Sequence, residues 1–595
     1  MPNQQTEYQQ VSAALTTLIN DLAPGLSKQA QLIIKRLVHS MSQQHSCLQI
    51  QQNDQDAIAE LLASPIASTG EVVTPLIIRG SQLYFHRYYR LERKIAERLS
   101  TLNQPAEIPG FSLPSLDQFF QAGTPFMMQK IAAYLATTRR LTIITGGPGT
   151  GKTSTVAKII SLIHHLQPAL TFALAAPTGK AASRLNQALQ QTWTENQFTY
   201  PSHLSSEVQT LHRLLGMSKD GGRPRYHQDR PLKFDILIID EASMIDLTLM
   251  SNLLDALNTH TRLILLGDPG QLPSVETGNL LADLTRPFPG FSADTLEQLK
   301  LNFQAESQSP GKQSKLMDAV CELKHSFRFS QQQGIGKLAR SIIKGDPEFP
   351  ADSEQVEVNS LSTSTVEQVI TPLSDYVRLL HQQIPLQRLF DELNCFKVLT
   401  PTREGPWGVI SINGHIEKML ETLNLKQPGQ SHYHGRAIMI LTNDYVLGLF
   451  NGDIGLCVDQ GKLTDLMQPA SDDSRTPSMV ACFPDGSGLK TVPLNRLPEH
   501  ETCFTMTVHK SQGSEFKQVG LVLAKAESDI SEHLQTRELL YTAVTRCRSK
   551  VSIFADPPTW EKAVQRQLGR SSGLAEFLAQ ADQQPDHKTS KLEAN

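Results

Sequence analysis

The chain has 595 residues, of which 39% are hydrophobic and 19% are charged, and its formal net charge is -4 at pH 7. This length and apolar content predict several domains with ordinary cores, which excludes a wholly disordered protein. The balanced charge gives no overall basic signature, so any contact with a nucleic acid would have to come from a local groove.

The seven cysteines are scattered and show no C-x-x-C spacing, so they give no indication of a zinc or iron–sulfur site. Free buried thiols in a reducing compartment are the interpretation we favour. The N-terminal ten residues are polar and lack a signal-peptide pattern, and no apolar run reaches the ~20 residues of a membrane span. We therefore expect a cytoplasmic protein.

Residues 1–110 are expected to form a first, mainly helical region. Apolar residues recur at helical spacing in 14–22 and 33–38, and a short strand at 83–85 precedes a further helix at 88–99. No chemistry stands out in this region. Its charged side chains are interpreted as structural, with docking onto a partner protein as the alternative.

From residue 126 the chain has the alternating pattern of a parallel α/β domain. Apolar strands are predicted at 141–145, 171–176, 234–239 and 262–266, with helical segments between them. A polar cluster follows each strand, and open α/β sheets bind ligands at that edge. The pattern predicts one domain with its ligand site at the carboxyl ends of the strands.

The strand at 141–145 runs directly into G-x-x-x-x-G-K-T at residues 146–153. Glycines let the backbone turn with its N–H groups inward, and the next helix turns its positive end to an anion. Lys152 would reach the β- and γ-phosphates of ATP, and Thr153 would place its hydroxyl on Mg²⁺. A glycine-rich surface turn is the alternative. The predicted ATP-binding residues are Gly146, Gly147, Pro148, Gly149, Thr150, Gly151, Lys152, Thr153 and Ser154.

Two carboxylates, Asp240 and Glu241, emerge together from the strand at 234–239. Hydrolysis of a γ-phosphate uses such a pair. Asp240 can hold Mg²⁺ through its water shell, and Glu241 can orient or deprotonate the attacking water. Simple capping of the next helix is the alternative.

The strand at 262–266 ends in a turn at 267–273 that contains Gln271. A glutamine beside a γ-phosphate can both donate and accept hydrogen bonds, so it can respond to water and to product. Without the neighbouring motifs the segment would be an ordinary turn.

The strand at 171–176 is also followed by a helix start, at 177–182. The first N–H groups of this helix and Thr178 are predicted to bind a backbone phosphate of a nucleic acid. His212, in the segment 210–214, is a candidate second contact, with a packed structural histidine as the alternative.

Beyond this domain, residues 291–317 are polar and are interpreted as a loop-rich insertion. The segment 323–329 supplies an isolated Arg328. No motif occurs from residue 346 to about 393, and this span is expected to connect into a second core.

The second core begins with a predicted strand at 395–400. Further β-rich segments occur at 437–441, 454–458 and 479–483. Their turns and spacing predict a small barrel-like insertion, after which the parallel pattern resumes at 519–523 and 551–555.

The second core has no phosphate loop of its own, but it carries Arg546. This combination suits a motor in which one lobe binds ATP and the other contributes an arginine finger. An exposed helix charge is the alternative for Arg546. Residues 581–595 are polar and charged, and we expect a disordered tail there.

Eight segments stand in the order of the motifs of superfamily 1 DNA helicases. They are GGPGTGKT, APTGKAA, TLHRLLG, DEAS, GDPGQLPS, HSFRF, VHKSQGSEF and LLYTAVTRCR, and they resemble the 5′→3′ branch. The segments TPTREGPWGV, NDYVLGLFNGDIG and RLPEHETCFTMTVHKSQGSEF extend the resemblance to the RecD family, the alpha subunits of exodeoxyribonuclease V (RecBCD). The motifs cover residues 129 to 548.

The resemblance implies roles for residues that the chemistry alone leaves open. Gln129 would recognise adenine, and Gln271, Arg328 and Arg546 would sense or stabilise the γ-phosphate. The track for single-stranded DNA would contain Thr178, His212, Thr507, His509, Lys510 and Ser511.

The resemblance also implies partners. Residues 1–110 would dock onto a RecC-like subunit, and the nuclease activity of the complex would belong to a RecB-like subunit of the heterotrimer. Relatives that act alone carry a longer N-terminal extension, so the short N-terminal region favours a subunit of a complex.

The expected fold is α/β, with two RecA-like P-loop lobes, a mainly helical N-terminal domain and a small β-barrel (SH3-like) insertion. The expected boundaries are 1–110, 111–350 and 351–580, with the insertion at about 430–500 and a tail at 581–595. The expected function is an ATP-dependent 5′→3′ DNA helicase acting on double-strand ends in recombinational repair. The alternatives are a stand-alone helicase and a non-catalytic scaffold that binds ATP.

Overall fold

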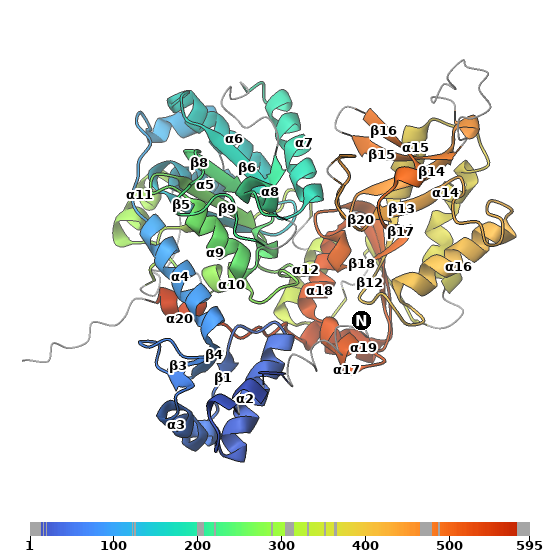
Figure 1. Ribbon diagram of the computed structural model, residues 1–595. Helices are drawn as coiled ribbons and strands as arrows, with labels where there is room; N and C mark the ends of the chain where they lie inside the picture. The colour runs from blue at the N-terminus through green and yellow to red at the C-terminus, as the bar shows by residue number, and fades with distance from the viewer. Residues whose placement is uncertain are drawn as a thin grey trace, which may run out of the picture.

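The computed structural model has an N-terminal region and two larger lobes that face each other across a cavity (Figure 1). The structure describes residues 14–15, 17–19, 21–121, 123, 126–198, 208–218, 222–286, 289–303, 314–329, 333–349, 353–361, 366–444, 446–463, 479–485 and 488–579. The tail predicted at 581–595 lies outside these residues. Within them, no helix is both long and apolar enough to span a membrane.

The N-terminal region combines helices with a small sheet. Helices α2 (Lys28–Ser42) and α3 (Gln55–Ala63) share one apolar core with this sheet, whose strand order is β1-β4-β3-β2. The strands are β1 (Leu48–Gln49), β2 (Ala67–Ser68), β3 (Leu76–Arg79) and β4 (Gln82–Phe85). The predicted strand at 83–85 is confirmed. The sequence does not predict the other three because strands of two to four residues show no readable alternation.

The two ends of the described chain meet at this region. Helix α4 (His86–Leu102) packs against lobe 1, and α20 (Leu574–Leu578) packs against α4 (Figure 1). Glu92 of α4 is fully buried and accepts hydrogen bonds from the Ser572 hydroxyl at 2.9 Å and the Gly573 N–H at 3.1 Å. Burial raises the pKa of Glu92. The C-terminal segment therefore ties the N-terminal region to the rest of the molecule.

Lobe 1 is built on a six-stranded, wholly parallel sheet with the order β10-β5-β9-β8-β6-β7. Its strands are β5 (Leu141–Gly146), β6 (Phe172–Ala176), β7 (Gln209–Thr210), β8 (Ile236–Ile239), β9 (Arg262–Gly267) and β10 (Val320–Leu323). All four predicted strands are confirmed. Because they are buried on both faces, their near-continuous apolar sequences are the expected pattern for a parallel sheet.

Helices cover both faces of this sheet. One face packs against α5 (Met127–Thr138), α6 (Lys152–Leu166), α7 (Gly179–Glu195) and α11 (Ala293–Phe303). The other face packs against α8 (Leu211–Leu215), α9 (Leu247–Ala256) and α10 (Leu280–Thr285), together with α4. The predicted loop-rich insertion at 291–317 thus contains a helix, and residues 304–313 lie outside the described part.

Lobe 2 contains a five-stranded parallel sheet with the order β11-β20-β19-β12-β18. The strands are β11 (Val356–Asn359), β12 (Phe396–Thr400), β18 (Thr505–Thr507), β19 (Phe516–Leu523) and β20 (Cys547–Ala555). The predicted strands at 395–400, 519–523 and 551–555 are confirmed. Its helices include α12 (Gly334–Lys344), α13 (Val366–Ile370), α14 (Ser374–Leu379), α15 (Leu386–Cys395), α16 (Val409–Thr422), α17 (Asp529–Leu534), α18 (Arg537–Thr545) and α19 (Pro557–Gln565).

The transition between the lobes lies earlier than the predicted residue 350. Helix α12 contacts α18, and its apolar side chains Ile335, Leu338 and Ile342 belong to the core of lobe 2. Strand β10, which ends at Leu323, still pairs with β5 of lobe 1. The chain therefore crosses between the lobes just after β10.

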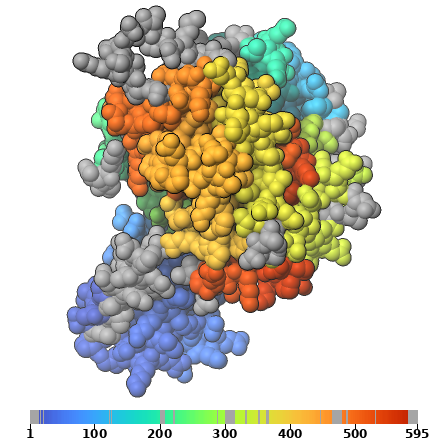
Figure 2. All heavy atoms as spheres, turned by 90° about the vertical axis from the view of Figure 1, so that its right-hand side faces the viewer, coloured from blue at the N-terminus to red at the C-terminus, as the bar shows by residue number. Residues whose placement is uncertain are grey.

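A separate antiparallel sheet with the order β16-β15-β14-β13-β17 is inserted into lobe 2. Its strands are β13 (Arg436–Ile440), β14 (Ile454–Asp459), β15 (Met479–Asp485), β16 (Gly488–Pro493) and β17 (His500–Thr502). The sheet has its own apolar core, and the three β-rich segments predicted here are confirmed as strands. Figure 2 shows this orange sheet above the blue N-terminal region, which projects below lobe 2.

Candidate nucleotide and nucleic-acid site

The phosphate loop follows β5 and leads into α6, as the sequence predicts. Gly149 and Gly151 have φ angles of 73° and 81°, a left-handed conformation that favours glycine. A Cβ on Gly149 would lie only 2.3 Å from the Cβ of Arg328, so this glycine also permits close packing. The Lys152 ammonium donates to the Gly146 carbonyl at 2.7 Å and to the Gly147 carbonyl at 3.1 Å. The loop therefore holds a positive charge where a phosphate chain would lie.

Gln129 and two aromatic rings lie beside this loop. Gln129 of α5 is buried, and its Nε2 lies 3.5 Å from the Thr150 carbonyl oxygen. Phe126 stacks on Phe327 with 5.3 Å between ring centroids, and Phe327 is 47% exposed. An exposed ring next to a carboxamide provides a platform for a nucleotide base. No separate role was predicted for either phenylalanine, although each lies close in sequence to a predicted site residue.

The carboxylate pair stands at the end of β8. Glu241 has φ 54°, which is uncommon for a non-glycine residue and indicates a backbone held in strain. Its N–H donates to Asp240 Oδ1 at 2.8 Å. Burial and the adjacent Glu241 carboxylate raise the pKa of Asp240. The half-buried Asp240 carboxylate would therefore gain from a neighbouring cation.

The donor set around Asp240 fits Mg²⁺. The Asp240 carboxylate and the Thr153 hydroxyl line the same cavity. No cluster of three or more histidine, cysteine or acidic residues capable of holding a metal occurs among the described residues. Mg²⁺ is commonly held by one or two protein oxygens together with substrate phosphates and water, which matches this sparse arrangement.

Lobe 2 contacts the turn after β9 through α18. Arg546 donates to Gln271 Oε1 at 2.6 Å, and Tyr541 donates its hydroxyl to Asp268 Oδ2 at 2.9 Å. The Leu272 N–H also donates to the hydroxyl of Thr542 at 2.9 Å. Arg546 is only 3% exposed, so the interpretation as an exposed helix charge is wrong. Gln271 links the lobes instead of forming an isolated turn.

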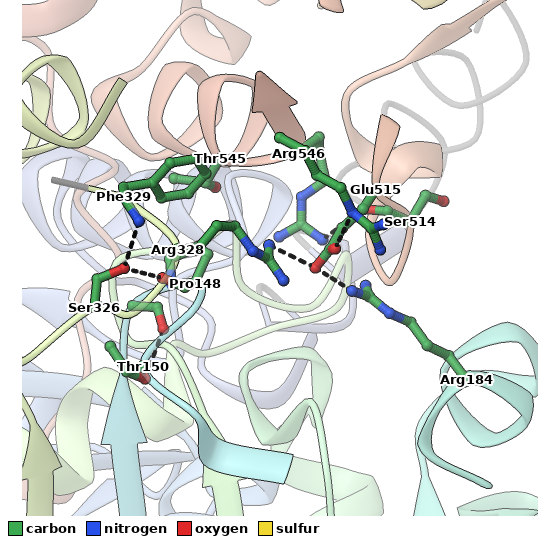
Figure 3. A network of polar contacts seen from close by, with 12 residues as sticks. Pro148, Thr150, Arg184, Ser326, Arg328, Phe329, Ser514, Glu515, Thr545 and Arg546 are labelled. Carbon is green, nitrogen blue, oxygen red and sulfur yellow. Dashed lines mark hydrogen bonds and ion pairs between the residues drawn. The ribbon is translucent and has the colours of Figure 1, made fainter. Parts of the chain in front are cut away.

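Glu515 of lobe 2 receives arginines from both lobes. It pairs with Arg328 at 2.8 Å and with Arg184 of α7, both from lobe 1, and with Arg548 of lobe 2 at 3.0 Å (Figure 3). Burial alone would raise the pKa of Glu515, but the guanidinium groups of Arg184 and Arg328 outweigh it and hold this pKa at about 2. Glu515 is therefore ionised throughout the physiological range.

The sequence predicted no role for Arg184 or Glu515. Arg184 lies two residues beyond APTGKAA, the predicted phosphate-binding helix start, and Glu515 lies within VHKSQGSEF. Together with the phosphate loop, they line a cavity of about 1220 Å³ between the lobes. A cavity of this size is ample for a nucleotide.

The residues predicted to bind DNA in lobe 1 lie at the ends of neighbouring strands. Thr178 caps α7, because its hydroxyl accepts a hydrogen bond from the Ala181 N–H at 3.2 Å. His212, in α8, is exposed, so the interpretation as a packed histidine is wrong. A Cβ on Gly179 would lie 2.8 Å from the Phe450 side chain, so the inserted sheet reaches the N-terminus of α7.

The residues predicted to bind DNA in lobe 2 form a turn after β18. Lys510 donates to Glu501 Oε1 at 3.0 Å, and Arg403 pairs with the same carboxylate at 2.5 Å. The Thr507 hydroxyl accepts from the Lys510 N–H at 3.3 Å. Burial lowers the pKa of His509 to about 4, so its imidazole is neutral at physiological pH. Ser511 is fully buried and donates to the Val508 carbonyl at 2.6 Å, which makes it a support for the turn.

Two family descriptions match this chain. Residues 129–277 match the AAA domain, which covers the phosphate loop, the carboxylate pair and the turn after β9. Residues 502–554 match the UvrD-like helicase C-terminal domain, which covers β18 to β20 and Arg546.

Curated relatives match nearly the whole chain. The "RecBCD enzyme subunit RecD" of Mycolicibacterium smegmatis is 35% identical over 545 residues, which cover 89% of this chain and 87% of the relative. The protein of the same name from Haemophilus influenzae is 32% identical over 550 residues, covering 85% and 81%. The "ATP-dependent RecD2 DNA helicase" of Deinococcus radiodurans is 26% identical over 529 residues, covering 87% of this chain and 60% of the relative.

Proposed function

The chain belongs to the RecD family of RecBCD enzyme subunits, and we propose from this premise that it is an ATP-dependent 5′→3′ DNA helicase subunit. It would process double-strand ends for recombinational repair. The observation that carries the proposal is the 2.6 Å contact between Arg546 of lobe 2 and Gln271 of lobe 1. Lobe 2 has no phosphate loop, and this contact brings its arginine to the edge of the lobe 1 sheet that carries the phosphate loop.

Residues of both lobes act on the nucleotide in this proposal. Gln129 recognises the adenine, and the exposed Phe327 ring supports it. Lys152 and the N–H groups of the loop bind the β- and γ-phosphates. Glu241 orients the attacking water and accepts its proton. Arg328, Arg546 and Gln271 stabilise or sense the charge of the γ-phosphate.

Thr153 and Asp240 would hold Mg²⁺, which neutralises charge on the β- and γ-phosphates when bound. The raised pKa of Asp240, caused by burial and Glu241, supports this assignment because a cation there relieves the repulsion between the two carboxylates.

The DNA strand runs across both lobes in this proposal. Thr178 and His212 contact it from lobe 1, and Thr507, His509 and Lys510 contact it from lobe 2, with Ser511 holding the turn. Lobe closure on ATP and opening after hydrolysis produce steps only if the affinity of a lobe for DNA differs between the two states. The inter-lobe contacts of Gln271 and Tyr541 are suited to transmit that difference.

We further propose that the N-terminal region docks onto a RecC-like subunit and that a RecB-like subunit carries the nuclease. Exposed apolar side chains of this region support docking, since Leu18 is 53%, Leu32 55% and Val73 81% exposed. A cytoplasmic location completes the proposal, and it is supported by the seven cysteines, none of which forms a disulfide and six of which are buried.

The inserted sheet is proposed to be an SH3-like module. Its five short antiparallel strands and separate apolar core support this assignment. The domain boundaries we propose are about 110 for the N-terminal region and about 330 for the transition between lobes, with the insertion at about 430–500.

Replacing Lys152 tests the catalytic assignment. We expect Lys152→Gln to reduce ATP turnover stimulated by single-stranded DNA at least hundredfold, because the phosphates lose their main side-chain cation. Equal turnover by the variant and the wild type would remove the catalytic role and favour a scaffold that only binds ATP.

Strand displacement on tailed duplexes tests the polarity. The proposal requires activity on a substrate with only a 5′ overhang, and activity confined to a 3′ overhang would contradict it. The match to the RecD2 helicase makes a stand-alone enzyme the second candidate. Unwinding by the purified chain without RecB-like and RecC-like proteins would favour that candidate.

A further inference from the structure

Glu515 forms ion pairs that join the two lobes at the cavity that the phosphate loop lines. Two of its arginine partners, Arg184 and Arg328, come from lobe 1 and cross the cavity to reach it, whereas Arg548 belongs to lobe 2. The Glu515 side chain is 9% exposed, against 61% for Arg548. Arg184 and Arg328 are 36% and 27% exposed, so the two crossing pairs are less open to water than the pair within lobe 2.

Arg328 is fixed to the phosphate loop at its backbone. The N–H of its neighbour Phe327 donates to the Gly149 carbonyl at 2.8 Å, and the Ser326 hydroxyl donates to the Pro148 carbonyl at 3.2 Å. The backbone of Arg328 is thus anchored beside the loop, while its guanidinium reaches Glu515 (Figure 3). A γ-phosphate in the loop and the Glu515 carboxylate would be two anions within reach of one guanidinium.

Arg184, like Arg328, lies both at Glu515 and at the predicted ATP site. It lines the same cavity as Asp240 and Glu241, the carboxylate pair of lobe 1, and its guanidinium pairs with Glu515. It also lines the cavity together with Lys152 and Thr153. No role in nucleotide binding was predicted for this residue from the sequence.

We propose that Glu515 competes with the γ-phosphate of ATP for the guanidinium groups of Arg184 and Arg328, and that Arg184 is a further γ-phosphate-binding residue. The proposal rests on ATP binding at the phosphate loop, as assigned above. Guanidinium groups bind carboxylates and phosphates with the same planar fork, so one anion can replace the other without rearranging the donors.

The competition gives the motor a means of distinguishing ATP from ADP. ATP brings a third phosphate that takes the arginines from Glu515, so the ion pairs that hold lobe 2 to lobe 1 are exchanged for arginine–phosphate pairs. ADP has no γ-phosphate and leaves the arginines on Glu515. The arrangement of the lobes then depends on the nucleotide because ATP and ADP differ in their affinity for the two states.

Nucleotide binding without turnover tests the proposal. The dissociation constants of fluorescent AMP-PNP and fluorescent ADP are measured for the purified full chain and for Glu515→Gln, which keeps the shape of the side chain and removes its charge. We expect the variant to bind AMP-PNP about tenfold more tightly and ADP within about twofold of the wild type, a coupling within the usual range.

Two further variants locate the effect. Arg184→Ala is expected to weaken AMP-PNP binding about tenfold with little effect on ADP, and adding it to Glu515→Gln should reduce the gain from the glutamine, since the two residues act through one contact. Arg548→Ala is the matched control. It removes an arginine from the same carboxylate without touching a pair that crosses the cavity, and both affinities should stay within about twofold.

Equal tightening for AMP-PNP and ADP would show a general effect of the lost charge and overturn the proposal, as would no change for either nucleotide. Thermal unfolding verifies that each variant is folded. Glu515→Asp, which keeps the charge on a shorter side chain, should give an intermediate shift and serves if the glutamine variant does not fold. If the wild type did not bind AMP-PNP at all, the proposed nucleotide site would be contradicted. Failure of the nucleotide site is therefore distinguishable from failure of the proposed competition by Glu515.

Discussion

The two lobes present opposite edges of their parallel sheets to the cavity. Lobe 1 presents the carboxyl ends of its strands, where the phosphate loop follows β5 and Asp240 follows β8. Lobe 2 presents amino ends, because Glu515 immediately precedes β19 and Arg546 immediately precedes β20. Glycine loops and helix N-termini gather at a carboxyl edge, whereas an amino edge offers mainly side-chain charges. Lobe 1 thus offers an anion mainly backbone N–H groups, whereas lobe 2 offers individual charged side chains.

Under the proposed function, this difference explains how a lobe without a phosphate loop would take part in hydrolysis. Arg546 stands at the C-cap of α18, where the helix dipole favours a cation, and its guanidinium also donates to the Thr542 and Ser514 carbonyls. Backbone acceptors thereby hold one buried charge in place. Loss of this arginine of lobe 2 should therefore affect catalysis more than binding, whereas changes in the loop backbone of lobe 1 should affect binding first.

The largest expected effect is that of Arg546→Ala. Loss of an arginine finger typically costs 10³-fold or more in turnover, so we expect about a 10³-fold fall in kcat while AMP-PNP binding changes only a few-fold. Steady-state ATP hydrolysis with single-stranded DNA, measured beside nucleotide binding, separates the two effects. A comparable loss of binding would erase the contrast between the lobes.

Gly149→Ala is expected to have the next largest effect, and on binding. Its φ of 73° and the 2.3 Å approach to the Arg328 Cβ make any side chain costly there. Backbone strain of about 2 kcal/mol would weaken ATP binding about 30-fold. Gly414→Ala in α16 is the matched control because its added Cβ meets nothing within 4 Å, and it should leave binding unchanged. Similar losses in both variants would contradict the role of the loop backbone.

Gln271→Ala should have a smaller effect that appears only when DNA is present. Gln271 donates to Asp268 at 3.2 Å and accepts from Arg546, so it connects the turn of lobe 1 with the arginine of lobe 2. We expect the stimulation of ATP hydrolysis by single-stranded DNA to fall about tenfold, within the usual range of coupling energies. The ratio of ATP turnover with DNA to turnover without DNA measures this stimulation. An unchanged ratio would show that Gln271 does not couple the two lobes.

The same contrast determines what the sequence could reveal. The phosphate loop and the carboxylate pair were predictable because a buried strand, glycines and a helix start are local signals. The role of Arg184 and Glu515 was not, because it depends on which side chains two separate lobes bring together. Single charges of this kind have many structural explanations until their partners are known.

The fold shows the same division between local and long-range information. The long apolar strands of both lobes and the strands β13, β14 and β15 were predicted from their patterns. Strands β1, β2 and β3 of the N-terminal region were too short for a pattern, and the place of α12 in lobe 2 depends on its contact with α18. The burial of Ser511 was equally unpredictable. The sequence of a polar motif does not indicate which of its residues contacts DNA and which supports the turn.

The contrast between backbone and side-chain binding also predicts a difference along the DNA track, with the smallest effect. Lobe 1 offers the N-terminus of α7 and the neutral Thr178, whereas lobe 2 offers Lys510 beside Arg403. Only a charged side chain exchanges with counterions on the DNA. Lys510→Ala should therefore reduce the slope of log affinity against log salt concentration by about 0.7, the value for one phosphate contact on a single strand.

Thr178→Val should weaken DNA binding without changing the slope, and Lys525→Ala, at an exposed position, is the control for loss of a surface charge. A slope changed by Thr178→Val, or left unchanged by Lys510→Ala, would show that the division seen at the nucleotide does not extend to DNA.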